Sequence, residues 1–222
     1  MEVATALSDV PLSQLQPADA AQLSTLFDEA LAVEELYLDR PENNYNIANH
    51  LAYQGDASGA KRSYEAALAR DPTFVPAYVN LAEMQRSTDG EAASMATLRR
   101  GLDAAGDAPG LHYALGLALV RQADLPGALV ELEQAWRHGE GEGAFAYAYA
   151  LALDESGERN RAVAVLETSR EFHPNDRQVL YALVYYLSLA GDTEKALRHA
   201  RHLAELEPED PTVAELLRRL GG

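Results

Sequence analysis

The sequence predicts an all-α protein in which helix hairpins stack into a solenoid, and three observations support this fold class. Small residues recur in steps of 34, at Ala60, Ser94, Ala128, Ala162 and Ala196. Turn residues keep the same step, from Gly55-Asp56 to Gly191-Asp192. Between the turns, apolar residues are spaced three and four apart, as on one face of a helix. A single hairpin cannot bury such a face, so neighbouring hairpins must stack to form the core.

The repeat step divides the chain into elements that follow one another in order. Residues 1–16 show no periodicity, and we expect a flexible segment there. A capping helix is predicted over 17–40, because Pro17 suits the first turn of a helix. A second capping helix is predicted over 211–222, from Pro211 to the final glycine pair. Between the caps we expect five repeat units, at 41–74, 75–108, 109–142, 143–176 and 177–210.

Each unit is predicted to contain two helices. Several second helices end at Pro72, Pro174 or Pro208, because proline cannot continue a helix. The recurring small residues mark places where two helix backbones approach closely. Large apolar residues are expected to fill the rest of the core, at Tyr64, Leu98, Leu132 and Leu166.

The stretch GAFAYAYALALD, residues 143–154, alternates large and small apolar residues and by itself is typical of a β-strand. The repeat step instead makes it the first helix of the fourth unit. On a helix, Tyr149 and Leu153 fall on the core side, while Tyr147 and Leu151 share another face. The alternation then results from alanines that fill the remaining positions.

The composition argues against several classes of function. The net charge of −17, from 35 acidic and 18 basic side chains, opposes binding to nucleic acid and to anionic lipid surfaces. The absence of cysteine excludes disulfides and thiolate metal sites. No signal peptide and no apolar run of about 18 residues is present, so we expect a soluble chain without membrane insertion.

We expect no cofactor, no metal site and no catalytic residues. His199, His202 and Glu205 recur at three-residue steps, but a closed metal site needs more ligands. The sequence GEGEG, residues 139–143, resembles a phosphate loop in composition only and is better explained as an elongated turn between repeats. No carboxylate belongs to a recognisable set with a nucleophile and an orienting base, so an enzyme is not predicted.

The repeat resembles the tetratricopeptide repeat (TPR) family over residues 41–210. The resemblance implies a right-handed TPR solenoid whose concave groove is lined by the first helices. The chain departs from the family where a tryptophan is expected near the start of each unit. The residues that carry the resemblance are the period of 34, Leu115-Gly116, Ala128, Tyr64, Leu132, Ala67, Ala135 and Pro72.

The fifth and ninth residues of each unit are the candidate peptide-groove residues that this resemblance implies. Four of the five fifth residues are tyrosine, which combines a large rigid surface with a polar tip. We predict a non-catalytic protein–protein interaction scaffold that binds a peptide or helix segment, with Asn49, Glu83 and Arg86 setting its orientation. Alternatively, these rings pack against neighbouring hairpins and complete the core. The two sets are Tyr45, Val79, Tyr113, Tyr147 and Tyr181, and Asn49, Glu83, Leu117, Leu151 and Tyr185.

The TPR proteins that clamp a C-terminal carboxylate use lysine, asparagine and arginine at such positions. Here Tyr45, Gly110 and Ala114 stand where cations are needed. An unpaired carboxylate would lose its hydration without compensation, so this class of ligand is disfavoured.

Three segments also resemble the TPR tails of bacterial multihaem c-type cytochromes, at residues 27–48, 111–122 and 145–158. This resemblance implies the C-terminal part of a larger exported redox protein, a tail that docks a partner, and a periplasmic location; otherwise the location is cytoplasmic. A further alternative is a structural spacer or homo-oligomerising module. The sequence does not identify the partner protein.

Overall fold

The structure is a computed structural model of the 222-residue chain. It describes residues 16, 18–19, 21–22, 25–26, 29, 34, 37–139 and 142–221. These residues form helices and turns without any strand, which confirms the predicted all-α class. The chain divides into two compact units, residues 1–106 and 107–222.

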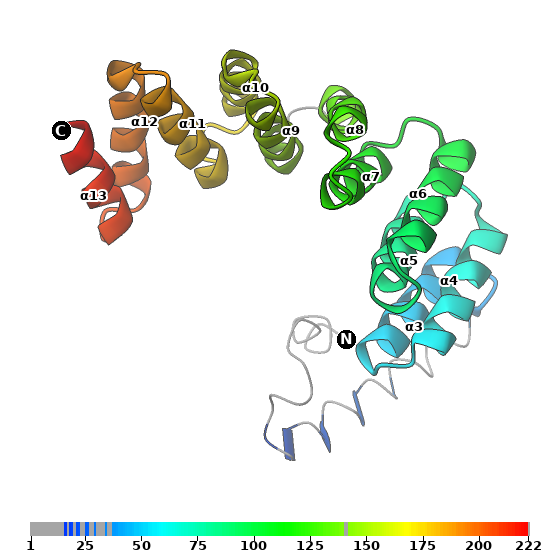
Figure 1. Cartoon of the computed structure of the whole chain (residues 1–222). Helices are drawn as coiled ribbons and strands as arrows, with labels where there is room; N and C mark the ends of the chain where they lie inside the picture. Colours follow the sequence, from blue (N-terminus) through cyan, green and yellow to red (C-terminus); the bar gives the residue numbers. More distant parts are fainter. Residues whose placement is uncertain are drawn as a thin grey trace. The chain divides into compact units, whose positions relative to one another are not determined.

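The first unit contains two consecutive helix hairpins (Figure 1). In the first hairpin, α3 (Pro41–Tyr53) packs against α4 (Ala57–Arg70), and in the second, α5 (Val75–Thr88) packs against α6 (Glu91–Ala105). Helix α5 also packs against α4, so the two hairpins share one core. Prolines occupy the first turn of α3 and α5, where a missing N–H costs no helical hydrogen bond.

The second unit contains three hairpins followed by a single helix (Figure 1). Each helix packs against the next one along the chain, and α11 also packs against α9. The first helices of successive hairpins are therefore neighbours, as a solenoid requires. The seven helices are α7 (Pro109–Arg121), α8 (Leu125–His138), α9 (Gly143–Glu155), α10 (Arg159–Phe172), α11 (Arg177–Leu189), α12 (Thr193–Leu206) and α13 (Pro211–Leu220).

Aspartates begin several helices by accepting a hydrogen bond from a backbone N–H in the first turn. Asp56, Asp124 and Asp192 do so at α4, α8 and α12. Each satisfies one N–H that has no partner within the helix, which stabilises the helix by about 1 kcal/mol. In the fourth hairpin Glu158 occupies this position and makes no such bond. The recurring turn sequence is therefore a recurring helix start.

The small and large residues that the repeat step predicts belong to the core. Ala60, Ala128, Ala162 and Ala196 are fully buried. The large residues Tyr64, Leu98, Leu132 and Leu166 are also buried, beside this row of small residues. Burying one leucine side chain contributes about 1.5–3 kcal/mol, so these rows account for much of the stability of each hairpin.

The stretch from Gly143 forms helix α9, so its local strand pattern was overridden by the repeat. Tyr149 and Leu153 are buried there, as predicted. The predicted flexible segment 1–16 and capping helix 17–40 fall mainly outside the described residues. Within the described part of the chain, none of the helices has the length and hydrophobicity needed to cross a bilayer.

Candidate functional site

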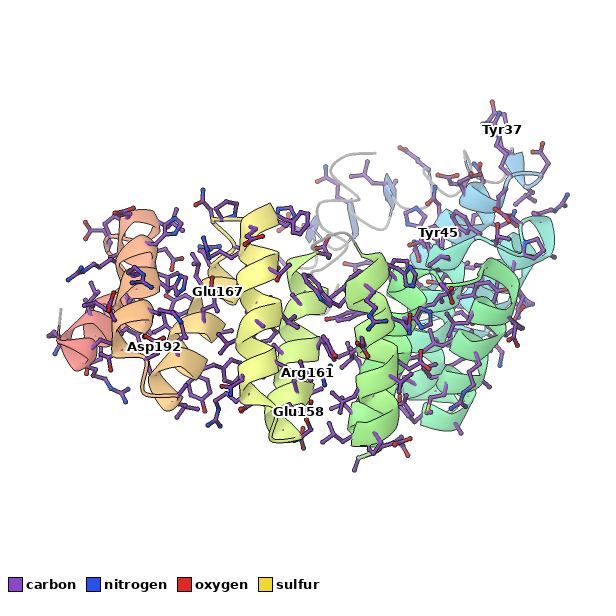
Figure 2. All side chains as sticks on the ribbon, turned by 90° about the horizontal axis from the view of Figure 1, so that it is seen from above. Tyr37, Tyr45, Glu158, Arg161, Glu167 and Asp192 are labelled. Atoms are coloured by element: carbon purple, nitrogen blue, oxygen red, sulfur yellow. The ribbon has the colours of Figure 1, made fainter. Side chains whose placement is uncertain are left out.

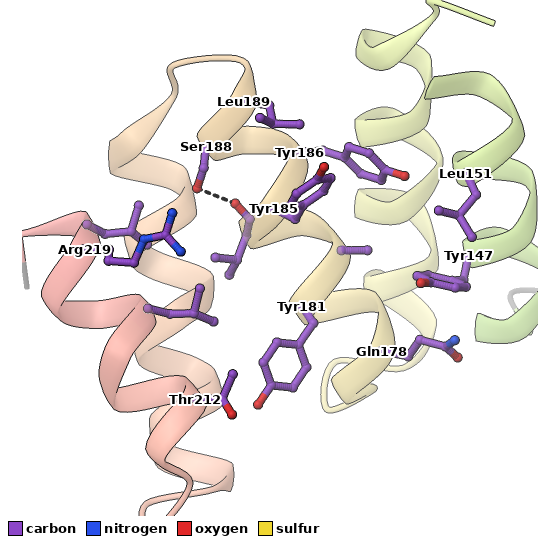
Figure 3. A pocket seen from close by; sticks show the side chains of 14 residues that line it. Tyr147, Leu151, Gln178, Tyr181, Tyr185, Tyr186, Ser188, Leu189, Thr212 and Arg219 are labelled. Atoms are coloured by element: carbon purple, nitrogen blue, oxygen red, sulfur yellow. Dashed lines mark hydrogen bonds between the residues drawn. The ribbon is translucent and has the colours of Figure 1, made fainter. Parts of the chain in front are cut away.

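The second unit has a pocket of about 710 Å³ between helices α9, α11 and α13 (Figure 3). We call it the α11 pocket, because α11 forms its floor. Its surface is mainly apolar and aromatic, with four tyrosines and a single charged side chain. The lining residues are Tyr147, Leu151, Gln178, Tyr181, Ala182, Val184, Tyr185, Tyr186, Ser188, Leu189, Thr212, Leu216, Arg219 and Leu220.

Four of the candidate groove residues meet in this pocket. Tyr147 and Leu151 come from α9, one helical turn apart, and Tyr181 and Tyr185 come from α11 in the same way. Leu189 continues the α11 row by another turn. Leu151 is 45% exposed and Tyr185 is 59% exposed, so large apolar surface faces solvent in this pocket.

Tyr181 has its ring in the pocket and its hydroxyl bonded to acidic groups at the pocket end. The hydroxyl lies 3.1 Å from Glu207 Oε2 and 3.3 Å from Asp210 Oδ2. Desolvation, together with these carboxylates, raises the pKa of Tyr181 to about 12. The ring therefore links α11 to the turn between α12 and α13, and the hydroxyl remains a donor throughout the physiological pH range.

Tyr186 is a lining residue that the sequence pattern did not identify. Its side chain is 2% exposed, and its ring lies 5.2 Å from that of Tyr185 in an edge-on arrangement. Burial raises its pKa to about 12, and the charge of Asp154 adds to this shift. Tyr186 points toward α9 in Figure 3, whereas Tyr185 is open to solvent. The buried ring supports the pocket floor and the exposed ring offers contact area.

Helix α13 forms the remaining wall. Leu216 and Leu220 pack against the core cluster around Val213, as expected for a capping helix, and they also line the pocket. Arg219 extends from α13 toward α11 (Figure 3). The repeat step carried a signal for this role: counted from Pro211, Arg219 is the ninth residue of a sixth first helix. The sequence prediction instead assigned α13 only to capping.

Tyr113 and Leu117 lie on α7 and do not line the α11 pocket. Both are half-buried. The ring of Tyr113 packs 4.9 Å from the ring of Phe145 on the next first helix. Burial raises the pKa of Tyr113. At this position the tyrosine fills a contact between hairpins, which is the alternative role that the sequence left open.

In the first unit, Tyr45 and Asn49 belong to a polar network between α3, α4 and α5 (Figure 2 labels Tyr45). Asn80 donates from Nδ2 to the Tyr45 hydroxyl and to Asn49 Oδ1, each at 2.9 Å. The Tyr64 hydroxyl donates to the same Asn49 oxygen at 2.6 Å. The Tyr45 ring also packs edge-on against Phe74, at 5.4 Å. These groups hold the two hairpins together.

The other candidates of the first unit lie on α5. Val79 is half-buried, whereas Glu83 and Arg86 are exposed. Arg86 Nη2 lies 2.5 Å from Glu83 Oε1, an ion pair one helical turn long. The hydrogen bond and charge of Glu83 raise the pKa of Arg86. An exposed pair of this kind adds little to stability, because water screens the two charges.

The histidines of α12 engage α10 and the α10–α11 turn (Figure 2 labels Glu167 on α10). His199 Nε2 lies 3.0 Å from Glu167 Oε1, and His202 Nε2 lies 3.0 Å from Asn175 Oδ1. Arg170 also donates to Glu167. Over the residues that the structure describes, no group of three or more histidines and carboxylates is arranged to hold a metal ion.

The hairpin array defines a helical-repeat protein, an α-solenoid. Residues 119–184 match the family model described as tetratricopeptide repeat. This match and the stacked hairpins both support a TPR solenoid fold. A comparison with curated proteins found no significant match.

Solved TPR structures share the fold at low sequence identity. YrrB is described as a TPR protein with an unusual peptide-binding site. It is 21% identical, with a TM-score of 0.59, and the alignment covers 87% of this chain and 97% of YrrB. PilW, a type IV pilus biogenesis factor, is 14% identical, with a TM-score of 0.66, and the alignment covers 98% of this chain and 99% of PilW. PilF of Pseudomonas aeruginosa is 17% identical, with a TM-score of 0.65 and coverage of 87% and 84%.

Proposed function

We propose that this chain is a non-catalytic scaffold that binds a peptide or helix segment of another protein in the α11 pocket. The TPR fold supports a protein–protein interaction scaffold in general. One observation carries the more specific proposal: four residues predicted to line a groove converge on one apolar pocket of about 710 Å³. A volume of this size accepts two or three large side chains of a peptide.

The chemistry of the pocket suits anchoring by apolar side chains. Leu151, Tyr185 and Leu189 are all exposed large residues, and covering them would remove apolar surface from water at about 25 cal/mol per Å². Tyrosine rings add rigid contact area that loses little entropy when a partner binds. Binding energy in such sites is concentrated in a few central anchors.

YrrB supports the proposal by analogy, because its description assigns it a peptide-binding site that is unusual among TPR proteins. At 21% identity the likeness shows the shared fold only. The location of the site in the present chain therefore rests on its own pocket.

Substitution of exposed pocket residues tests the proposal. The variant Leu151→Ala/Tyr185→Ala removes two exposed anchors, and Val130→Ala/Phe172→Ala is the matched control. Val130 and Phe172 are each 58% exposed and lie outside the α11 pocket. Peptides selected from a display library on the whole chain are then titrated by calorimetry against all three proteins. We expect at least a tenfold loss of affinity in the pocket variant, or about 1.4 kcal/mol, and no loss in the control.

Equal affinity for the two variants would contradict the proposal, provided that both keep the melting temperature of the original chain. Light scattering over a range of concentrations tests whether a second copy occupies the pocket instead. A dimer that dissociates on Leu151→Ala/Tyr185→Ala substitution would assign the pocket to self-association.

A further inference from the structure

The α11 pocket has one charged lining residue, Arg219, and this residue has no ionic partner in the described part of the chain. It is exposed on the last turn of α13, and none of the observed ion pairs or hydrogen bonds between described residues includes it. Its guanidinium therefore stands beside an apolar pocket, without an ionic partner among the described residues.

The neighbouring arginines behave differently. Arg218, the preceding residue, lies 2.5 Å from Glu215 Oε2, and Arg177 at the start of α11 lies 2.6 Å from Glu207 Oε1. The chain has 35 acidic and only 18 basic side chains, so carboxylate partners are abundant. Arg201 on α12 also lacks an observed ion pair, so what distinguishes Arg219 is its place in the lining of an apolar pocket.

We infer that the partner segment carries an aspartate or glutamate side chain beside its apolar anchors, and that Arg219 binds this carboxylate. The inference rests on the proposed function of the α11 pocket. A guanidinium presents two parallel N–H donors that match the two oxygens of a carboxylate. Apolar walls reduce the screening of such a pair by water. Arg219 would thus select among apolar segments by charge.

The single cation among the lining residues favours a side-chain carboxylate over a chain terminus. A terminal carboxylate is held by several convergent donors, whereas this pocket offers one cation. The Ser188 hydroxyl already donates to the Val184 carbonyl oxygen, at 2.6 Å.

A charge-reversal experiment tests this inference. Random linear peptides of about 12 residues, displayed with both ends fused, are selected on three forms of the whole chain: the original, Arg219→Glu and Arg201→Glu. Arg201 is exposed on α12, lies outside the pocket and has no observed ion pair, so Arg201→Glu is a control of equal charge. Enriched sequences are resynthesised with amidated C-termini and titrated in solution.

We expect peptides selected on the original chain and on Arg201→Glu to place aspartate or glutamate at a fixed spacing from large apolar residues. Arg219→Glu should bind these peptides at least about tenfold more weakly and should select lysine or arginine at the same spacing. Replacing the acidic residue by glutamine should reduce the affinity for the original chain but not the affinity for Arg219→Glu. Selection of apolar peptides without an acidic preference would overturn the inference, as would selection of lysine or arginine by the original chain.

The two levels of the proposal can fail separately. Peptides that depend on Leu151 and Tyr185 but bind equally to Arg219→Glu leave the pocket assignment intact and refute the role of Arg219. Peptides that bind independently of Leu151 and Tyr185 refute the pocket assignment itself.

Discussion

A Cβ atom added to Gly116 on α7 would lie 2.7 Å from Leu132 Cγ on α8. Real Cβ atoms essentially never approach another heavy atom this closely. Gly116 and the fully buried Leu132 thus set the separation of the third hairpin. In the other hairpins the equivalent residues are Ala48, Ala82, Ala150 and Val184, so the third hairpin has the smallest side chain at this contact.

We predict that Gly116→Ala destabilises the chain, although alanine favours helix by about 1 kcal/mol relative to glycine. Overpacking at Leu132 should cost about 1–3 kcal/mol and outweigh that gain. Urea unfolding followed by circular dichroism measures the net change.

A double-mutant cycle identifies the cause of this loss. Leu132→Ala alone should cost about 2–5 kcal/mol, because it leaves a cavity. Combined with Gly116→Ala, the total should be smaller than the sum of the two single effects. A strictly additive result would show that the added methyl group does not contact Leu132.

We predict that Ala123→Gly stabilises the turn between α7 and α8. Ala123 has φ +58°, and it is the only described residue other than glycine with positive φ. The equivalent residues Gly55, Gly157 and Gly191 have φ between +79° and +86°. Left-handed backbone costs alanine about 1–2 kcal/mol, and the greater entropy of glycine in the unfolded chain offsets part of this gain.

The net increase in unfolding free energy for Ala123→Gly should be about 0.5 kcal/mol. Thermal and urea unfolding measure it, with Ala118→Gly as a control inside α7. The control should lower the stability, because glycine favours the helix less than alanine does and there is no left-handed backbone to relieve at this position. Equal losses in the two variants would show that the turn is not strained.

Acidification should reduce stability through His199. Burial lowers the pKa of His199, although Glu167 opposes the shift. The unfolded chain therefore binds a proton at higher pH than the folded chain, and stability falls as the pH drops below about 6.5. Burial also lowers the pKa of His50 in the first unit, although Glu34 opposes the shift, so part of the pH dependence belongs to His50.

Urea unfolding at about pH 7.5 and pH 5.5 tests this. His199→Gln keeps an N–H donor for Glu167 but cannot titrate, so its loss of stability between the two pH values should be smaller than in the original chain. His138→Gln, at the exposed end of α8, should leave the loss unchanged. An unchanged loss in His199→Gln would contradict the assignment.

Alkaline pH should act through Tyr181. Its folded pKa of about 12 lies above the usual value of 10.0, so the stability it contributes is present below about pH 10 and is lost as the pH rises toward 12. Tyr181→Phe removes the bonds to Glu207 and Asp210 and should cost about 1 kcal/mol at neutral pH.

The loss of stability between about pH 8 and pH 10.5 should also be smaller in Tyr181→Phe. Tyr185→Phe is the control, because the Tyr185 hydroxyl makes no observed bond to another described residue. If Tyr181→Phe and Tyr185→Phe both lose as much stability between these pH values as the original chain, the role of the Tyr181 hydroxyl is contradicted.

The repeat step predicted the fold because it depends on local and regularly spaced residues. Turn glycines, aspartate helix starts and buried alanines all follow from sequence position, and even the strand-like stretch from Gly143 was assigned to a helix correctly. The same counting brought together Tyr147, Leu151, Tyr181 and Tyr185, because residues one turn apart share a helical face.

The other contacts of the candidate site depend on distances between hairpins, and the spacing of residues along the sequence does not give these distances. Tyr45 and Tyr113 occupy the same repeat position as Tyr147, yet Phe74 and Phe145 pack against their rings. The sequence prediction missed Tyr186 because it considered only residues expected at the surface of a groove. The ring of Tyr186 is buried and supports the pocket from below. The wall contributed by α13 was missed because a helix after the last complete unit was treated as a cover only.

Helix α13 has a practical consequence for work on this protein. Leu220 lines the α11 pocket, and Gly221 follows it directly. A purification tag or fluorescent reporter fused after Gly222 would begin within a few residues of this lining side chain. Labels for binding measurements therefore belong at a distant exposed side chain such as Val130.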